Sequence, residues 1–395
     1  MKYKEKEVDY YDVAVVGAGP SGCACARITS KAGLKTIIIE KFSLPRYKPC
    51  TGYLIPESIA HIKEHFGEPP SEVFAAPGYL EVISMNFPSG RRLDIPVEGW
   101  LVWRDRFDWW LCQSSGAVVI PETSLVSFQE DEEGVVLNCV KKKGEEVKIR
   151  AQVMVGADGG PSRIVEQLDP GARKSLQWFI VAQELYSGRC DFHPGWYHFF
   201  AYPEFNIHSA GFLKDEIVVL ELGVPLGEKM GPHWERFKDF LKKEYNFRPE
   251  KLLKKSAIRL TFGVQQGYVN FGTSRVLVVG EASGLLNMYA EGISSALGSG
   301  LSAGKAIVKA IKEELDPGEV YRQEVEPERL RTARQFSLYN QIFGVIGSVD
   351  YKKGLARLPF FQRLLVMKDL TGWVLYTSSK KKHFLLPSFL RRTRF

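Results

Sequence analysis

A glycine-rich segment near the start of the chain has the residue types and spacing for binding a nucleotide. An apolar run, residues 12–16, leads into the motif from Gly17 to Gly22, and a second apolar run, residues 36–39, ends at the acidic Glu40. Gly17 permits a tight turn, Gly19 lets the backbone approach a pyrophosphate, and Gly22 lets the following helix pack closely on the strand. The N–H groups that begin this helix attract phosphates, and a carboxylate at Glu40 can accept hydrogen bonds from ribose hydroxyls. The order predicts a βαβ unit that binds a dinucleotide; a glycine turn without a ligand is the alternative.

Two later segments also end an apolar strand with small residues and an acid. Residues 152–157 lead into Asp158 and Gly159, and residues 276–279 lead into Gly280 and Glu281. Small residues at a strand end let the backbone come close to a polyphosphate, a ribose or a ring. We therefore expect three separate parts of the chain to contribute to one nucleotide site.

The stretches between these motifs have a different character. Residues 175–266 are rich in predicted strands and in aromatic residues, with one helix near residues 233–245. A second helix is expected after residue 103, with Phe107, Trp110 and Leu111 on one side. The simplest arrangement is a nucleotide-binding domain in three pieces with a β-rich domain inserted between them. The expected boundaries are residues 8–78, 101–174 and 267–330 for the first domain, 79–100 and 175–266 for the inserted one, and 331–395 for a basic helical region.

Size and composition fit a folded protein of two or three substructures. The chain has 395 residues, of which 45% are hydrophobic and 25% are charged, as in soluble globular proteins. Its six cysteines are scattered with no Cys-x-x-Cys pair, which favours reduced thiols over disulfides or a metal site. Residues 1–9 are highly charged and no apolar run reaches about 18 residues, so neither a signal peptide nor a transmembrane helix is expected. These features predict a cytoplasmic protein, or one on the cytoplasmic face of a membrane.

The net charge of +7 is concentrated in the C-terminal region. From residue 351 to 395 the chain carries eleven Lys and Arg and a single acid, Asp369, so the remainder has a net negative charge. From residue 336 onward, clusters of Leu, Phe and Trp alternate with these bases, a pattern that suits a helix in an anionic membrane interface. A helical layer packed on the nucleotide-binding domain is the alternative. Nucleic acid is not an expected partner, because the tail is too apolar and the rest of the chain is acidic.

Taken together, the three nucleotide motifs resemble the FAD-binding fold of the para-hydroxybenzoate hydroxylase superfamily, and within it the geranylgeranyl reductase family. The resemblance runs from about residue 10 to 330. It implies an α/β protein with a Rossmann-like FAD-binding domain, an inserted β-sheet substrate domain and a C-terminal helical segment. The cofactor it implies is FAD.

The resemblance also assigns roles to single residues. Glu40 would hold the adenosine ribose, Arg104 would stand beside the pyrophosphate, and Glu281, where the superfamily usually has Asp, would accept from ribityl hydroxyls. The motif at Asp158 would lie near the pyrophosphate and could also contact a reduced pyridine nucleotide. Val165 stands where this motif usually has Arg, which puts the contact with a pyridine nucleotide in doubt. The residues expected to bind FAD are Gly17, Gly19, Pro20, Ser21, Gly22, Glu40, Lys41, Arg46, Cys50, Thr51, Arg104, Leu125, Asp158, Gly159, Gly280, Glu281, Gly292 and Ile293.

The segment from residue 45 to 53 supports the resemblance to the geranylgeranyl reductases in particular, within the wider superfamily. It is similar to the reductases' loop in which Lys-x-Cys precedes a Gly-rich turn near the isoalloxazine, with Thr51 in place of one Gly and Tyr53 adding bulk. Cys50 is the candidate catalytic residue: a thiol there could hydrogen-bond, help relay a proton or shape the substrate tunnel. A small buried hydrophobe is the alternative.

The aromatic stretch at residues 198–203 loosely resembles the Tyr-x-Trp-x-Phe-Pro motif of the reductases, with only the Pro kept. Large alternating side chains on a strand could form an apolar wall for a polyprenyl chain or an aromatic ring, although ordinary sheet core is the alternative. His193, His198 and His208 have no metal spacing; each is a structural histidine or a candidate proton donor. The expected pocket residues are Tyr53, His198, Phe200, Tyr202 and Pro203.

These features predict an FAD-dependent oxidoreductase that reduces C=C bonds of a hydrophobic isoprenoid or prenyl lipid by hydride transfer from reduced flavin. The electron donor would be NAD(P)H or a ferredoxin-like protein. One alternative is an aromatic monooxygenase or halogenase, although the chain has no Trp-x-Trp-x-Ile-Pro segment. The other is a membrane-docked flavoprotein that passes electrons to quinone.

Overall fold

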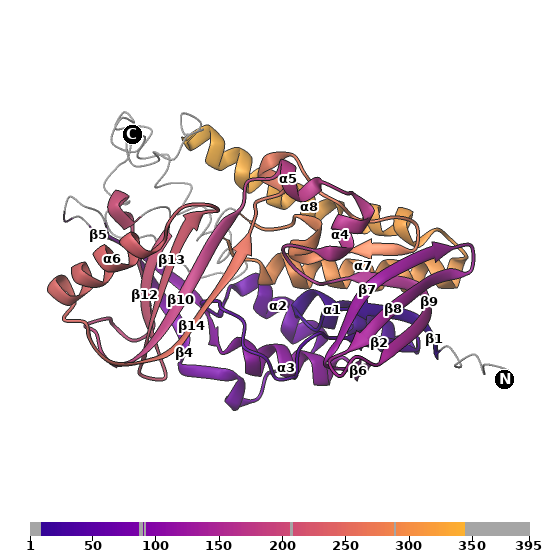
Figure 1. Ribbon diagram of the computed structural model, residues 1–395, viewed down its shortest axis with the longest axis horizontal. Helices are drawn as coiled ribbons and strands as arrows, with labels where there is room; N and C mark the ends of the chain where they lie inside the picture. Colours follow the sequence, from indigo (N-terminus) through magenta and orange to yellow (C-terminus); the bar gives the residue numbers. More distant parts are fainter. Residues whose placement is uncertain (1–8, 87–89, 91, 206–207, 288–289, 344–395) are drawn as a thin grey trace, which may run out of the picture.

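The computed structural model of the chain describes residues 9–86, 90, 92–205, 208–287 and 290–343 (Figure 1). Two sheets with different topologies lie beside each other, and helices cover the first of them (Figure 1). The predicted α/β fold is confirmed. The C-terminal region expected at residues 331–395 lies outside the described residues from 344 onward. Among the described residues, no helix is long and apolar enough to cross a membrane.

The first sheet has the strand order β6-β2-β1-β9-β8-β7, and β15 also pairs with β9. Its core is parallel, because β1 pairs in parallel with β2 and β9, and β2 with β6. All four residues of β2 are buried, as expected where helices or strands cover both faces of a parallel sheet. The strands are β1 (Asp9–Val16), β2 (Thr36–Ile39), β6 (Val118–Ile120), β7 (Thr123–Asp131), β8 (Gly134–Lys141), β9 (Glu146–Gly156) and β15 (Val276–Val278).

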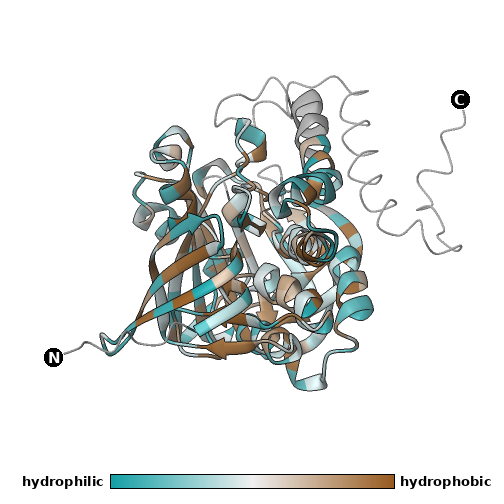
Figure 2. Cartoon of the chain, turned by 90° about the vertical axis from the view of Figure 1, so that its right-hand side faces the viewer, coloured by the Kyte–Doolittle hydropathy of each residue, from teal (hydrophilic) through white to brown (hydrophobic). Residues whose placement is uncertain are grey.

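Helices α1 (Pro20–Lys31) and α7 (Ile293–Glu313) pack closely on one face of this sheet. A Cβ built at Gly300 would lie 2.1 Å from the Ser21 carbonyl oxygen, so glycine is required where the two helices touch. Figure 2 shows apolar segments in these strands and in the helices beside them. Other helices are α2 (Pro56–His65), α3 (Arg104–Ser114), α4 (Arg163–Leu168), α5 (Ala172–Ser175) and α8 (Pro317–Phe343).

The second sheet has the order β14-β10-β13-β12-β11-β4-β5-β3 and is antiparallel except between β11 and β4. Its strands come from residues 53–54, 74–102 and 179–260, so the chain passes repeatedly between the two sheets. They are β3 (Tyr53–Leu54), β4 (Phe74–Asn86), β5 (Arg92–Val102), β10 (Phe179–Arg189), β11 (Trp196–Phe200), β12 (His208–Lys214), β13 (Ile217–Pro225) and β14 (Arg248–Leu260).

Side chains alternate between the two faces of the second sheet. On one face, Leu220 and Leu222 pack with Trp234 and Phe237 of helix α6 (Gly231–Glu244); we call this the helix face. On the other, Val219 packs in a cluster with residues that border the segment 45–52; we call this the loop face. The helices predicted near residues 104–114 and 233–245 are confirmed as α3 and α6.

Candidate functional site

The glycine motif forms a tight turn at the carboxyl end of β1. Gly17 has φ 116°, and a Cβ there would lie 2.3 Å from the Ala157 carbonyl oxygen. Gly19 precedes α1 without a side-chain cap, and a Cβ on it would meet only Arg46 Nη2, at 3.7 Å, among the described atoms. The first N–H groups of α1 therefore face open space where an anion fits.

Glu40 lies directly beside this turn. Its buried carboxylate accepts from the backbone N–H of Ala18 at 3.0 Å, from the N–H of Phe42 at 3.0 Å and from Arg46 Nε at 3.3 Å. The side chain is thus fixed at the end of β2, next to the glycine motif, as the sequence predicted for a ribose-binding acid. Lys41 follows it, with its amine 5.1 Å from the centre of the Phe42 ring.

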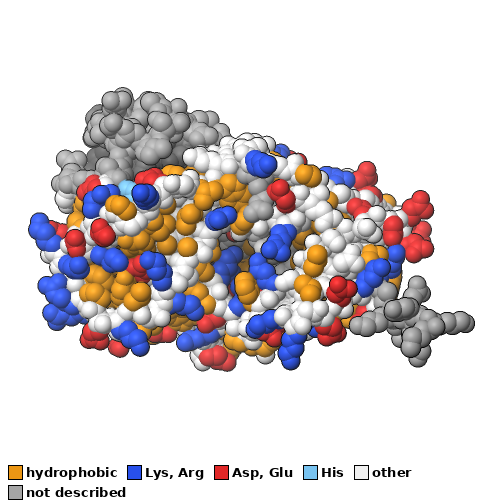
Figure 3. All heavy atoms as spheres, in the orientation of Figure 1, with side chains coloured by type: hydrophobic (Ala, Val, Ile, Leu, Met, Phe, Trp, Pro, Cys, Tyr) orange, Lys and Arg blue, Asp and Glu red, His pale blue; other side chains and the backbone are white. Residues whose placement is uncertain are grey.

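Two arginines converge on one buried carboxylate near Glu40. Asp108 of α3 accepts from Arg104 Nε at 2.8 Å and Nη2 at 2.9 Å, and from Arg46 Nη1 at 3.2 Å. Burial favours the protonated form of Asp108, but the two guanidinium groups hold its pKa below the ordinary value. Two nitrogens of the Arg104 guanidinium group therefore bind Asp108. The sequence did not reveal this partner. Figure 3 shows Lys and Arg side chains around a hollow in the middle of the molecule.

Glu281 is a half-buried acceptor, with its side chain 18% exposed. Its Oε1 atom is buried and has no hydrogen-bond partner among the described residues, and Lys48 Nζ lies 3.9 Å from Oε2. Burial raises the pKa of Glu281, and the charge of Lys48 opposes this. A buried carboxylate oxygen without a donor is costly. A ligand hydroxyl would satisfy it, so the site fits the ribityl chain of FAD.

Asp158 and the turn after it hold each other in place. The Asp158 carboxylate accepts from Ser162 Oγ at 2.7 Å and from the Arg163 N–H at 2.8 Å. Ser162 in turn caps α4 by accepting from the Val165 N–H at 3.0 Å. Gly159 has φ 74°, and a Cβ on it would meet no described atom within 4 Å. Asp158 thus shapes the turn, and Gly159 leaves space above it.

The N-terminus of α7 differs from expectation. The Ile293 and Ser294 N–H groups both donate to Glu291 Oε1 at 2.9 Å. A carboxylate at a helix N-terminus is stabilised by the helix dipole, which explains why Glu291 occupies the position. Ile293 is one of the residues expected to bind FAD, but its N–H is bound within the chain here, while Gly292 is the N-cap.

A buried lysine of the second sheet binds the backbone of the loop around Cys50. Lys214 Nζ donates to the carbonyl oxygens of Thr51 at 2.9 Å and Val102 at 2.7 Å. Its side chain is 1% exposed, and burial lowers the pKa of Lys214 to about 8. The Cys50 thiol accepts from the Gly52 N–H at 3.3 Å. The buried Lys214 ammonium group thus joins the backbone of Thr51 to that of Val102, which fixes the loop against the second sheet.

A buried carboxylate on the loop face connects the sheet to this loop. Glu221 Oε1 accepts from Gln183 Nε2 at 2.8 Å and from Thr51 Oγ1 at 3.2 Å. Glu221 Oε2 accepts from the Tyr197 hydroxyl at 2.9 Å and lies 3.5 Å from His208 Nε2. The four partners come from β10, the loop, β11 and β12. The sheet and the loop thus share one polar network.

The predicted pocket residues are split by the sheet. His198 and Phe200 point to the helix face, where His198 stacks on Phe192 with ring centroids 4.9 Å apart and Phe200 packs on α6. Tyr202 joins the same cluster, and Pro203 begins a short 3-10 turn. The structure does not bring these residues to Cys50. Tyr53 lies near the N-terminus of α7, where Glu291 adds to the effect of burial in raising the pKa of Tyr53.

Sequence reasoning missed several residues that the structure places next to the Cys50 loop: Tyr47, Gln183, Tyr197, Lys214 and Glu221. One signal was available for Glu221, which is the single charged residue within the apolar strand β13. Leu125, by contrast, packs from β7 against the core of the first sheet, away from this loop.

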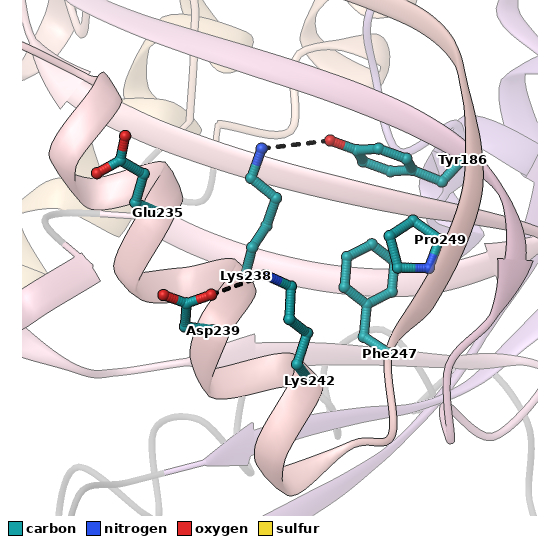
Figure 4. A pocket seen from close by; sticks show the side chains of 7 residues that line it. All are labelled: Tyr186, Glu235, Lys238, Asp239, Lys242, Phe247 and Pro249. Atoms are coloured by element: carbon teal, nitrogen blue, oxygen red, sulfur yellow. Dashed lines mark hydrogen bonds and ion pairs between the residues drawn. The ribbon is translucent and has the colours of Figure 1, made fainter.

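A separate hollow of about 350 Å³ lies on the helix face between α6 and β14 (Figure 4). Lys238 donates to the Tyr186 hydroxyl at 3.3 Å, and Lys242 pairs with Asp239 at 2.8 Å (Figure 4). Its cations are thus paired within the chain. The nucleotide motifs lie elsewhere, so we do not assign this hollow to the site.

Comparisons with known proteins agree with this geometry. A family model described as an FAD binding domain matches residues 112–192. Digeranylgeranylglycerophospholipid reductase from Methanocaldococcus jannaschii is 29% identical over 334 residues, which cover 77% of this chain and 78% of that protein.

Solved structures share the fold. A geranylgeranyl bacteriochlorophyll reductase-like protein from Thermoplasma acidophilum has a TM-score of 0.75 at 18% identity, covering 94% of this chain and 99% of its own. A myxobacterial chondrochloren halogenase has a TM-score of 0.70 at 13% identity, covering 95% and 91%. The matched FAD-binding segment and the sequence similarity over most of the length indicate an FAD-dependent oxidoreductase that is similar to digeranylgeranylglycerophospholipid reductases, and the solved structures share its fold.

Proposed function

We propose that this protein reduces C=C bonds of an isoprenoid or prenyl lipid. The observation that carries the proposal is the 334-residue similarity to a digeranylgeranylglycerophospholipid reductase, because 77% of the chain is more than the FAD-binding pieces alone and must include the second sheet. When bound, reduced FAD supplies a hydride for the double bond. The protein's residues bind the cofactor, orient the alkene and exclude water.

The geometry supports a set of residues for holding FAD. The turn from Gly17 to Gly22 and the start of α1 suit the pyrophosphate, with Arg46 beside it. Glu40 suits the adenosine ribose, and the spare oxygen of Glu281 suits a ribityl hydroxyl. Asp158 and Gly159 suit the turn that closes over the pyrophosphate. Arg104 acts chiefly by fixing Asp108.

We place the reacting double bond beside the loop of Cys50, Thr51 and Tyr53, on the loop face of the second sheet. The supporting observation is that Lys214 and Glu221 fix this loop to the sheet with buried hydrogen bonds. A loop held this firmly positions an apolar substrate and shields the reaction from water. Residues on the helix face, among them His198 and Phe200, would then stabilise the sheet by packing against its opposite face.

The proposal also covers the source of the electrons and the location of the protein in the cell. We favour NAD(P)H or a ferredoxin-like protein as donor, and a cytoplasmic protein that docks on an anionic membrane surface through its basic C-terminal region. Eleven Lys and Arg between residues 351 and 395, interleaved with apolar residues, support this docking. A lipid substrate would then be taken up where it resides.

An anaerobic experiment tests the function. The yellow protein is reduced with dithionite and mixed with a geranylgeranyl lipid, while flavin reoxidation is followed by absorbance and the lipid by mass spectrometry. We expect reoxidation coupled to a gain of two hydrogens per double bond. If the flavin stays reduced until quinone is added, the electron-relay alternative is correct. If it stays reduced until oxygen and an aromatic compound are added, and that compound is hydroxylated or halogenated, the monooxygenase or halogenase alternative is correct.

A further inference from the structure

We propose that His208, Glu221, Tyr197 and Thr51 form a relay that carries a proton from solvent to the Cys50 loop, where it completes reduction of the alkene. This inference rests on the proposed function, because it names the path of the proton which that reaction consumes. It concerns the loop face of the second sheet, and none of its members lies in the nucleotide motifs.

The outer end of the relay reaches water. The His208 side chain is 29% exposed, whereas that of Glu221 is 7% exposed. His208 Nε2 lies 3.5 Å from Glu221 Oε2 and 3.3 Å from the Tyr197 hydroxyl. An imidazole ring can both accept and donate a proton, so the partly exposed His208 can pass a proton from water toward the carboxylate behind it.

The inner end of the relay is the loop itself. Thr51 Oγ1 lies 3.2 Å from Glu221 Oε1 and 3.3 Å from Oε2, and the Tyr197 hydroxyl lies 2.9 Å from Oε2. Thr51 follows Cys50 directly, and Lys214 fixes its carbonyl oxygen. A proton that reaches Thr51 has therefore passed along the loop face from His208 and arrived beside the proposed position of the double bond.

The electrostatics of the network keep Glu221 ionised at rest, ready to accept a proton from its outer neighbour. Burial alone would raise the pKa of Glu221, but hydrogen bonds from His208, Tyr197 and Gln183 bring it below the ordinary value. Burial, reinforced by the charge of Glu221, raises the pKa of Tyr197 well above its usual range. A carboxylate base thus sits between an imidazole and two hydroxyl donors.

Other titratable groups also face this network and set its electrostatics. Tyr47 donates to Gln183 Oε1, and Lys254 Nζ lies 4.0 Å from the centre of the Tyr47 ring. Charge on Cys50 would act on Tyr197, and the carboxylate of Glu221 acts on buried Lys214. The cationic Lys214 in turn stabilises the ionised form of Glu221.

The step balances. The alkene gains a hydride at one carbon and a proton at the other, and its π bond becomes two C–H bonds. The two electrons come from reduced FAD, which is left oxidised. The proton comes from water through His208, and each member of the relay recovers its proton from its outer neighbour, so no residue is consumed.

The test uses the FAD-bound protein and four variants: Glu221→Gln, Tyr197→Phe, His208→Ala and, as matched control, Glu184→Gln. Glu184 is also a buried glutamate hydrogen-bonded to a tyrosine, but on the helix face. Each protein is reduced anaerobically and mixed with geranylgeranyl diphosphate in H₂O and in D₂O, across pH. A parallel reoxidation by ferricyanide, which needs no proton delivered to an alkene, reports on the bound flavin.

We expect Glu221→Gln to slow alkene-dependent reoxidation by about 100-fold, a usual contribution of positioned proton transfer. Ferricyanide reoxidation and the substrate concentration at half-maximal rate should stay unchanged. His208→Ala should respond to added imidazole with recovery of rate, which a structural role would not produce. Glu184→Gln should match the parent protein in both reoxidation rates.

The outcomes separate the two proposals. If the parent protein forms no saturated lipid, the proposed function is wrong. If the parent protein is active and the relay variants keep its rate, pH profile and solvent isotope effect, the relay is wrong while the function stands. If Glu221→Gln fails to fold, His208→Ala with and without imidazole decides, because His208 lies at the accessible end.

Discussion

Two buried polar side chains on opposite faces of the second sheet, Glu221 and His198, have opposite surroundings. On the loop face, Glu221 receives hydrogen bonds from three strands and from the Cys50 loop. On the helix face, both ring nitrogens of buried His198 lack a hydrogen-bond partner among the described residues, and aromatic rings surround it. A connected polar network is retained where it links parts of a site, whereas His198 behaves as a neutral aromatic spacer.

The largest effect is expected from Lys214→Met on the loop face. Methionine nearly fills the volume but leaves the carbonyl oxygens of Thr51 and Val102 without their donor, so the Cys50 loop loses its anchor. We expect alkene turnover to fall by about 100-fold and the free energy of unfolding to fall by about 2 kcal/mol. Turnover assays and denaturant unfolding measure the two quantities.

Lys238→Met is the matched control for Lys214→Met. Lys238 pairs with Glu184 at 3.1 Å behind the sheet, and its side chain is 27% exposed. Its loss should leave turnover intact. Equal loss of turnover in both lysine variants would contradict the distinction between the faces.

Gln183→Leu should have the next largest effect on alkene turnover, because Gln183 also lies on the loop face and binds Glu221. Gln183 donates to Glu221 and accepts from Tyr47, so leucine removes one of the interactions that lower the pKa of Glu221. The pKa of Glu221 should rise, and because its protonated form hands the proton inward, the fall of the alkene-dependent rate with rising pH should begin at a higher pH. Rates between pH 5 and 9 measure the shift. A profile identical to that of the parent protein would show that Glu221 does not control this step.

Glu184→Gln should affect stability more than chemistry. Glu184 is 2% exposed and receives hydrogen bonds from Tyr186 and Lys238. Loss of its charge weakens these bonds, and we expect unfolding to become easier by about 1–2 kcal/mol with turnover unchanged. Thermal unfolding with parallel activity assays measures both. A drop in turnover without a drop in stability would mean that the helix face takes part in the reaction.

The sequence revealed the cofactor region better than the substrate side, for a physical reason. Gly17, Glu40 and Glu281 belong to short motifs whose residues lie close together in sequence and in space, so spacing alone is informative. Glu221 and Thr51 are 170 positions apart in sequence, and only the pairing of the strands brings them together. The strand at residues 196–200 was recognised as aromatic, but which side of the sheet each residue occupies depends on its register.

His198→Phe tests that register and should have the smallest effect at pH 7. Burial lowers the pKa of His198 to about 4 from its ordinary value of 6.5, so between these two pH values the unfolded chain binds a proton that the native protein does not. The stability of the parent protein should therefore fall as the pH drops from about 6.5 to about 4, by up to about 3 kcal/mol. Phenylalanine, which can stack on Phe192 in the same place, removes this dependence and should leave turnover and stability at pH 7 unchanged. Denaturant unfolding at pH 7 and pH 5 measures the effect. Loss of turnover at full stability would instead put His198 in the substrate pocket, as residue type alone had suggested, and would require the reacting lipid to reach the helix face.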